Sequence, residues 1–227
     1  MPSRMLHLAV TESLLAALPF SDPRRLRAGS VLPDAEISSG DPPVKTAHFP
    51  LRLDGGRKKT LDLAGFRERF AGRLLQDDLV LGYYLHLAGD VIHRDFFYRC
   101  TDWKPADAAA VRVLHRDYAL LNPWIVKTFG LRKEDAVPGR EFLGTLAGDP
   151  LLSGFSFDLF GFFSEMEGDF DPPDPPPSPG DLTFFTESLA AEWIAAASGL
   201  LVREVVSLRS SGVSVLDERA MAWNRAG

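Results

Sequence analysis

The sequence predicts an all-α protein, a multi-helix bundle with one long inserted loop, and three observations lead to this fold class. Apolar residues recur at helical spacing over most of the chain, and only residues 211–215 alternate clearly enough to suggest a strand. Proline and glycine gather in residues 34–59, which we expect to form the long irregular loop. At 227 residues, the chain is long enough to bury a substantial core as a single domain, residues 1–227.

The periodic segments predict a series of helices joined by short connections. Asp22 and Pro23 are typical of a helix N-cap and first position, and Asp54, Gly55 and Gly56 favour a hairpin turn within the long loop. The acidic, proline-rich residues 171–181 are expected to form an exposed linker or flap. The expected helices cover residues 6–18, 23–32, 61–75, 76–100, 108–129, 140–147, 157–166 and 183–208.

Composition excludes several classes of protein. The net charge of −6 gives no strong signal for nucleic-acid binding, because phosphate contacts need clustered cations. Cys100 is the only cysteine, so neither an intramolecular disulfide framework nor a thiolate zinc cluster is possible. No apolar run reaches the about 20 residues of a transmembrane helix, and residues 1–20 lack the features of a cleaved signal. We therefore expect a cytoplasmic protein without a transmembrane segment.

The segment 76–100 is the strongest candidate for a functional site. It is almost continuously apolar, which predicts a buried helix, yet ionisable residues lie along one of its faces. Burying such groups without partners costs several kcal/mol, so the face requires hydrogen-bonding neighbours or a metal. Gly82 and Gly89 flank it, as expected where another backbone approaches closely. Residues three or four positions apart on this face are Tyr83, His86, Asp90, His93 and Phe97.

Two interpretations of this helix remain open from the residues. In one, His86 is a core histidine whose hydrogen bond is satisfied by Asp90 one turn away. In the other, both bind a metal together with donors from elsewhere: Asp34 and His48 in the long loop and His7 in the first helix. Histidine and carboxylate donors without thiolates suit zinc, and other divalent metals less specifically.

The same residues carry a resemblance to a known family. His7, the GSVLPD and KTAHF segments and GYYLHLAGD occur in the order and spacing that resemble the zinc-dependent phospholipase C family, which is similar in fold to the fungal zinc-dependent single-strand nucleases. A DYALLN segment at 117–122 is similar to one in small bacterial members of unassigned function. The resemblance covers roughly the first 125 residues.

The resemblance implies a zinc site formed by Asp34, His48, His86 and Asp90. It further implies that Asp90 bridges to a second metal held partly by His7, and that Asp34 accepts a proton from the attacking water, so Asp34 and Asp90 are the expected catalytic residues. The chain also departs from the family pattern, because Phe96 stands where a further histidine ligand is expected. One or two zinc ions are therefore expected rather than three, with His93 as an additional ligand or a donor that orients the others.

The function expected from these residues is that of a metal-dependent hydrolase, a phospholipase C-like phosphodiesterase acting on a small phosphoester or a phospholipid. The alternative is a metal-binding scaffold or accessory protein without hydrolytic activity. A phosphohydrolase built on an adjacent His-Asp pair is disfavoured, because no histidine in the chain is directly followed by aspartate.

Overall fold

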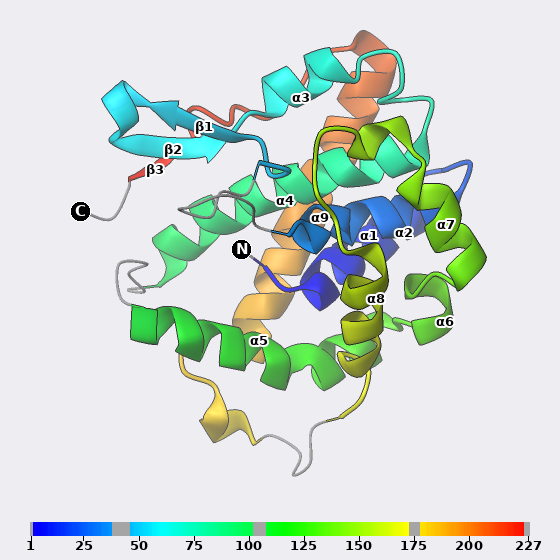
Figure 1. Cartoon of the computed structure of the whole chain (residues 1–227). Coiled ribbons are helices and arrows are strands. Elements are labelled where there is room, and N and C mark those ends of the chain that lie inside the picture. The colour runs from blue at the N-terminus through cyan, green and yellow to red at the C-terminus, as the bar shows by residue number, and fades with distance from the viewer. Residues whose placement is uncertain (1, 38–45, 102–107, 173–177, 225–227) are drawn as a thin grey trace.

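The structure is a computed structural model that describes residues 2–37, 46–101, 108–172 and 178–224. It is mostly α-helical, as the sequence predicts, with a small sheet at one edge of the helices (Figure 1). The helices are α1 (Arg4–Ala17), α2 (Pro23–Val31), α3 (Leu63–Arg69), α4 (Asp78–Cys100), α5 (Ala108–Phe129), α6 (Lys133–Ala136), α7 (Arg140–Ala147), α8 (Leu159–Gly168) and α9 (Glu187–Ser211).

The sheet was expected only as a hairpin. The strands β1 (Pro50–Leu53) and β2 (Lys58–Leu61) pair antiparallel, and β3 (Trp223–Asn224) adds to β2. The predicted turn at residues 54–56 is confirmed, and Asp54, Gly55 and Gly56 all take positive φ, which aspartate and glycine tolerate best. The segment therefore turns where the sequence indicates, although the third strand could not be foreseen from it.

The helix α4 lies at the centre of the molecule, packed against α2 and α9 (Figure 1). Asp77 caps it by accepting a hydrogen bond from the Leu79 amide, and residues 79–93 are all buried. The helix α1 packs on α2, α5 and α9. Because every residue from 79 to 93 is buried, the apolar character of this part of α4 around its whole circumference is accounted for.

Two glycines allow α2 and α4 to cross with their backbones in contact. A Cβ atom added to Gly29 would collide with the Leu79 carbonyl, and one added to Gly82 would collide with the Leu26 carbonyl. The predicted close approach at Gly82 is therefore confirmed. Its consequence is that the last turn of α2, with Ser30, lies directly beside the middle of α4.

Three predicted elements differ from the structure. The expected helix 61–75 is helical only over α3, because Leu61 belongs to β2 and the chain turns after Phe70 to reach the Asp77 cap. The strand expected at 211–215 is absent from the described structure, since Val215 folds back and donates its amide to Glu204 of α9.

The last helix begins later than the expected residue 183. The amides of residues 183–185 donate to the buried carboxylate of Asp117 on α5, and α9 begins only after Thr186, whose hydroxyl accepts from the Leu189 amide. These amides are unavailable to a helix because a side chain binds them. In the proline-rich segment, described residues 171–172, 178 and 180–181 are exposed as predicted, whereas 173–177 lie outside the described residues.

Candidate metal centre

His86 and Asp90 of α4 form the floor of the candidate site, and each is only 1% exposed. The His86 Nδ1 lies 2.8 Å from the Ser30 carbonyl, which can only accept a hydrogen bond, so Nδ1 carries the proton and Nε2 keeps its lone pair. Burial and the nearby His7 lower the pKa of His86 to about 4, which keeps the ring neutral. Through the Ser30 carbonyl, the close crossing of α2 and α4 fixes His86 in a form that can bind a metal.

Asp34 and His48 reach the same point from the segment that follows α2. Asp34 lies in a short 3₁₀ turn, Leu32–Ala35, which continues directly from that helix. The segment containing His48 is held by Glu36, whose carboxylate accepts from the Thr46 amide (2.8 Å), the Thr46 hydroxyl (3.1 Å) and the Ala47 amide (3.0 Å). Glu36 therefore ties the residues just before His48 to the residues just after Asp34.

Two further features fix the His48 segment. The Tyr83 hydroxyl of α4 donates to the Ala47 carbonyl at 2.6 Å, and Tyr83 is fully buried. Phe49, directly after His48, has a φ of 51°, an uncommon conformation for an aromatic residue. Such strained backbone persists only where the surroundings impose it, and it is frequent at functional sites. The structure therefore holds His48 in one position although residues 46–49 belong to neither a helix nor a strand.

The donor atoms of Asp34, His48 and His86 converge with the spacing of a metal site, and an oxygen of Asp90 lies near both histidines. Atoms bound about 2.0–2.1 Å from a tetrahedral zinc lie about 3.3–3.4 Å from one another. Of the five separations below, the two shortest match this value and the other three exceed it, while the carboxylates of Asp34 and Asp90 belong to different groups of donors within 4.8 Å of one another. The separations are 3.3 Å for His48 Nε2–His86 Nε2, 3.2 Å for His48 Nε2–Asp34 Oδ1, 3.7 Å for His86 Nε2–Asp90 Oδ2, 3.8 Å for His48 Nε2–Asp90 Oδ2 and 3.9 Å for His86 Nε2–Asp34 Oδ1.

Asp90 is the residue whose environment most requires a cation. Among the residues that the structure describes, neither of its carboxylate oxygens has a hydrogen-bond partner, although both are inaccessible to solvent. Burial alone raises the pKa of Asp90, but the nearby His86, His7 and His48 outweigh it and hold the pKa well below its usual range. A buried, ionised carboxylate without donors is costly, and a bound metal ion would remove that cost.

His7 approaches Asp90 from the opposite side. Its Nε2 lies 3.4 Å from Asp90 Oδ1, whereas His48 and His86 face Oδ2. The His7 ring stacks on His86 with centroids 4.0 Å apart, and a Cβ atom on Gly89 would lie 3.4 Å from that ring. Gly89 was expected to admit another backbone, but its neighbour is this histidine ring. The two oxygens of Asp90 thus contact different histidines, Oδ1 with His7 and Oδ2 with His48 and His86.

Two groups of ligand-type residues therefore lie within the described structure: Asp34, His48 and His86 form one, and His7, His86 and Asp90 form the other. Each could hold a metal ion, which agrees with the prediction of a metal site built from histidine and aspartate. The groups share His86, and its single Nε2 lone pair can serve only one ion. A four-donor site around Asp34, His48, His86 and Asp90 would therefore leave His7 and one oxygen of Asp90 for a second ion.

His93 does not belong to either group. It is buried one turn beyond Asp90, where its Nε2 lies 3.2 Å from the Tyr118 hydroxyl. Its ring stacks on Phe97 at 5.4 Å and meets Trp193 edge-on at 5.3 Å. Its expected role as an additional ligand or an orienting donor stays a prediction.

Sequence reasoning missed the residues that position the ligands. Glu36 and the Ser30 carbonyl were not singled out, and Tyr83 was noted only for its place on the helix face. A carboxylate two residues after Asp34 was a signal for Glu36, because a buried irregular segment needs acceptors for its amides.

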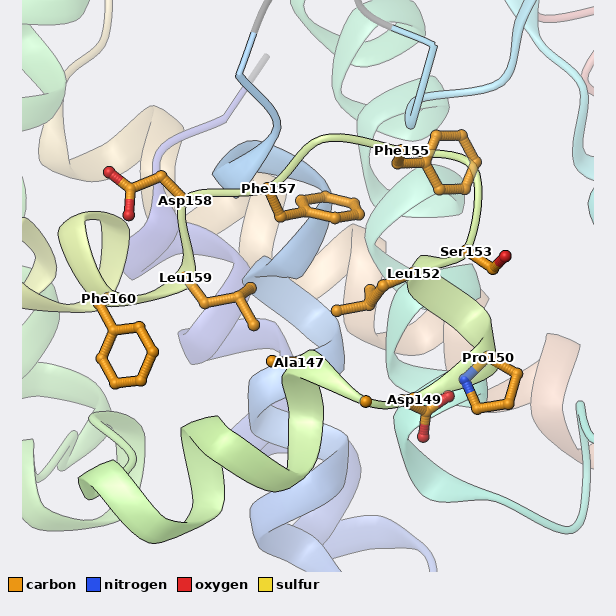
Figure 2. Close-up of a pocket in the computed structure, with 11 residues that line it drawn as sticks. Ala147, Asp149, Pro150, Leu152, Ser153, Phe155, Phe157, Asp158, Leu159 and Phe160 are labelled. Carbon is orange, nitrogen blue, oxygen red and sulfur yellow. The ribbon is translucent and has the colours of Figure 1, made fainter.

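Two hollows of similar size lie in the described part of the structure, and one of them is lined by Asp34. A hollow of about 570 Å³ is lined by Asp34 together with Arg94, Tyr118 and Asn122. A hollow of about 660 Å³ lies in the segment 147–160, where Leu152, Phe157 and Leu159 point into a common space (Figure 2). None of the proposed ligands lines the second hollow, whereas Asp34 lines the first.

No family model, curated protein or solved structure matches the chain. The resemblance to the zinc-dependent phospholipase C family therefore stays a prediction, and the case for a functional site depends on the geometry. Among the described residues, no helix has the length and apolar composition to cross a membrane.

Proposed function

We propose that the protein is a zinc-dependent phosphoric ester hydrolase, a phospholipase C-like phosphodiesterase whose substrate is a small phosphoester or a phospholipid. The observation that carries the proposal is that Asp34, His48 and His86 bring their donor atoms together, with the buried carboxylate of Asp90 beside the two histidines and without a hydrogen-bond partner among the described residues. Asp34, His48, His86 and Asp90 would hold one zinc ion. Two nitrogen and two oxygen donors at near-tetrahedral separations suit zinc better than calcium or magnesium, which prefer oxygen ligands.

The exposure of the site residues suggests different roles for them, holding the cation or acting on the water. His48, His86 and Asp90 are buried and serve to hold the cation, whereas the Asp34 side chain is 20% exposed and lines the hollow. Asp34 contacts His48 and His86 through Oδ1, so its Oδ2 is not used in these contacts and would be available to the attacking water. Bound zinc would lower the pKa of that water and neutralise charge on the phosphoryl oxygens.

Asp34 would accept the proton of the water molecule. Its carboxylate is ionised in the structure, because His86 and His48 lower its pKa to about 2 against the opposing effect of burial. Asp90 would stay ionised throughout and hold His7 and the two metal-facing histidines in place. A second, weaker cation between His7 Nε2 and Asp90 Oδ1 would have only these two protein donors among the described residues.

The experiment combines metal analysis with turnover. Purified protein is analysed for metal by mass spectrometry and assayed with bis(p-nitrophenyl) phosphate and p-nitrophenyl phosphate, before and after chelation. We expect about one tightly bound zinc, turnover that chelation abolishes and zinc restores, and loss of zinc in His48→Ala and Asp34→Ala. Unchanged metal content in both variants would show that the site is misassigned.

The same experiment separates hydrolysis from the scaffold alternative. The incomplete second group of donors favours a protein that binds metal without turning over a substrate, since many phosphoesterases use two clustered ions. Bound zinc, with no turnover of monoesters, diesters or phospholipids, would support the scaffold and contradict the hydrolase.

A further inference from the structure

The hollow beside Asp34 contains polar groups whose hydrogen bonds are incomplete. Asn122, only 6% exposed, donates from its amide nitrogen to Asp169 at 3.3 Å, but among the described residues its Oδ1 has no partner. The Nε of Arg94 is also buried without a hydrogen-bond partner in the described structure. Both residues line the hollow together with Asp34. The unmet donor of Arg94 suits a ligand with acceptor oxygens, whereas the unmet acceptor of Asn122 would need a donor such as a ligand hydroxyl.

Arg94 extends from the same helix as the metal-binding residues. It lies four positions after Asp90 in α4, so the two side chains leave one face of the helix with Cβ atoms about 5–6 Å apart. At this spacing an arginine and an aspartate commonly form an ion pair. No ion pair joins them in the described structure, and Arg94 instead reaches the hollow.

The guanidinium of Arg94 is oriented by aromatic residues rather than by a carboxylate. Its Nη1 donates to the Tyr98 hydroxyl at 3.1 Å, and its Cζ lies 5.2 Å from the centroid of the Trp223 ring. Among the described residues, no carboxylate oxygen lies within 4.0 Å of its nitrogens. The positive charge is held in place but is not neutralised, which leaves it available to an anion.

The neighbouring Arg4 differs in this respect. It lines the same hollow, but its Nε donates to Asp169 at 2.7 Å and its Nη1 lies 3.8 Å from Glu165. Its charge is therefore already compensated. Arg94 is the cation of this hollow that lacks a carboxylate among the described residues.

We propose that Arg94 binds the phosphoryl oxygens of a phosphoester in this hollow, beside the metal centre; the inference rests on the proposed function for the role of the bound group in turnover. A guanidinium presents parallel N–H donors that match two oxygens of a phosphate. Its fixed charge would also offset the negative charge of the phosphoryl group. This role suits a site whose second group of metal ligands is incomplete.

The experiment measures binding of inorganic phosphate and of glycerol 3-phosphate by calorimetry, in both metal-free and zinc-loaded protein. Arg94→Gln should weaken binding at least about tenfold in both forms, and Arg94→Lys, which keeps the charge, should recover part of it. The matched control is Arg99→Gln on the same helix, whose side chain is 69% exposed and paired with Asp95, and it should leave binding unchanged. If the Arg94→Gln and Arg94→Lys variants melt at the same temperature as the wild type, the loss of binding is not due to unfolding.

Sedimentation with phosphatidylglycerol vesicles distinguishes a lipid-borne phosphoester from a soluble one. Binding that depends on Arg94 supports the proposal with either ligand and assigns the source. Affinities that are the same in Arg94→Gln and wild type, or no binding of any of these ligands, would overturn it.

The two proposals fail in different ways. If zinc-dependent turnover of bis(p-nitrophenyl) phosphate is observed and Arg94→Gln leaves kcat/KM unchanged, the hydrolase stands and the role of Arg94 is wrong. If phosphate binding depends on Arg94 but no zinc-dependent turnover exists, the anion site stands and the hydrolase is wrong.

Discussion

Replacing Asp90 with asparagine removes the negative charge of one proposed metal ligand while keeping the shape of the side chain. Changes in groups that merely orient metal ligands lower affinity about 10- to 100-fold, so loss of a ligand itself should reach at least about 100-fold. Asp90 contacts the donor group through Oδ2 at 3.7–3.8 Å from His86 and His48, and His7 through Oδ1 at 3.4 Å. Asparagine offers one weaker acceptor oxygen and an amide nitrogen that repels a cation. The substitution should therefore weaken both the binding of the metal and the contact with His7.

The expected size of the effect follows from linkage between binding and folding. Free zinc at 100 times the wild-type dissociation constant stabilises the folded state by about 2.7 kcal/mol. For a chain of 227 residues, about 2–4 °C of melting temperature corresponds to each kcal/mol, so zinc should raise the wild-type Tm by about 5–11 °C. If the dissociation constant for zinc is 100-fold higher in Asp90→Asn, the same zinc concentration stabilises this variant by only about 0.4 kcal/mol, which raises its Tm by about 1–2 °C.

The assay is thermal denaturation of chelated, dialysed protein with and without added zinc. Each variant is compared with its own metal-free form, so any change in intrinsic stability cancels. Asp95→Asn is the control, because Asp95 lies on the same helix but pairs with Arg99 at the surface, and it should keep the full zinc-dependent shift. A wild-type Tm that zinc leaves unchanged, or a zinc-dependent shift of equal size in Asp90→Asn, would refute the reasoning. His86 and Asp90 would then be a buried pair of the core that binds no metal.

Three further predictions concern the surroundings of the site. Gly82→Ala places a methyl group against the α2 backbone and should lower the free energy of unfolding by at least about 1–3 kcal/mol in urea denaturation. The control Gly144→Ala, in α7, has open space around the new methyl group and should not lower the free energy of unfolding. Glu36→Ala releases the segment before His48 and should weaken zinc binding about 10- to 100-fold by competition with a chromophoric chelator, while unchanged affinity would argue against this positioning role. Since the pKa of buried His86 is lowered to about 4 from 6.5, the unfolded state binds the extra proton first, so the stability of metal-free protein should fall as pH drops from about 6.5 to 4. That fall should be smaller in His86→Gln, and an equal fall in both proteins would contradict the assignment.

Local sequence was sufficient to predict the helical character of the protein and the part of the site that lies on one helix. The spacing of four between His86 and Asp90 places both on one face of α4, whatever the rest of the chain does. The cap at Asp22 and the turn at residues 54–56 were predictable for the same reason, because side-chain and backbone preferences act within a few residues. Helix ends that depend on distant partners could not be predicted in this way. The start of α9 is an example, because the amides before it bind Asp117, which is far away in the sequence.

The arrangement of the donors was decided only by the tertiary structure. Sequence order indicated Asp34 and His48 as candidates, but their convergence on Asp90 depends on the backbone contact of α2 with α4 at Gly82 and on the hydrogen bonds of Glu36. The uncompensated charge of Arg94 is likewise a property of packing, because an aspartate one turn away predicts an ion pair that does not form. Periodicity fixes which side chains share a face, whereas contacts between distant segments determine which partners that face receives.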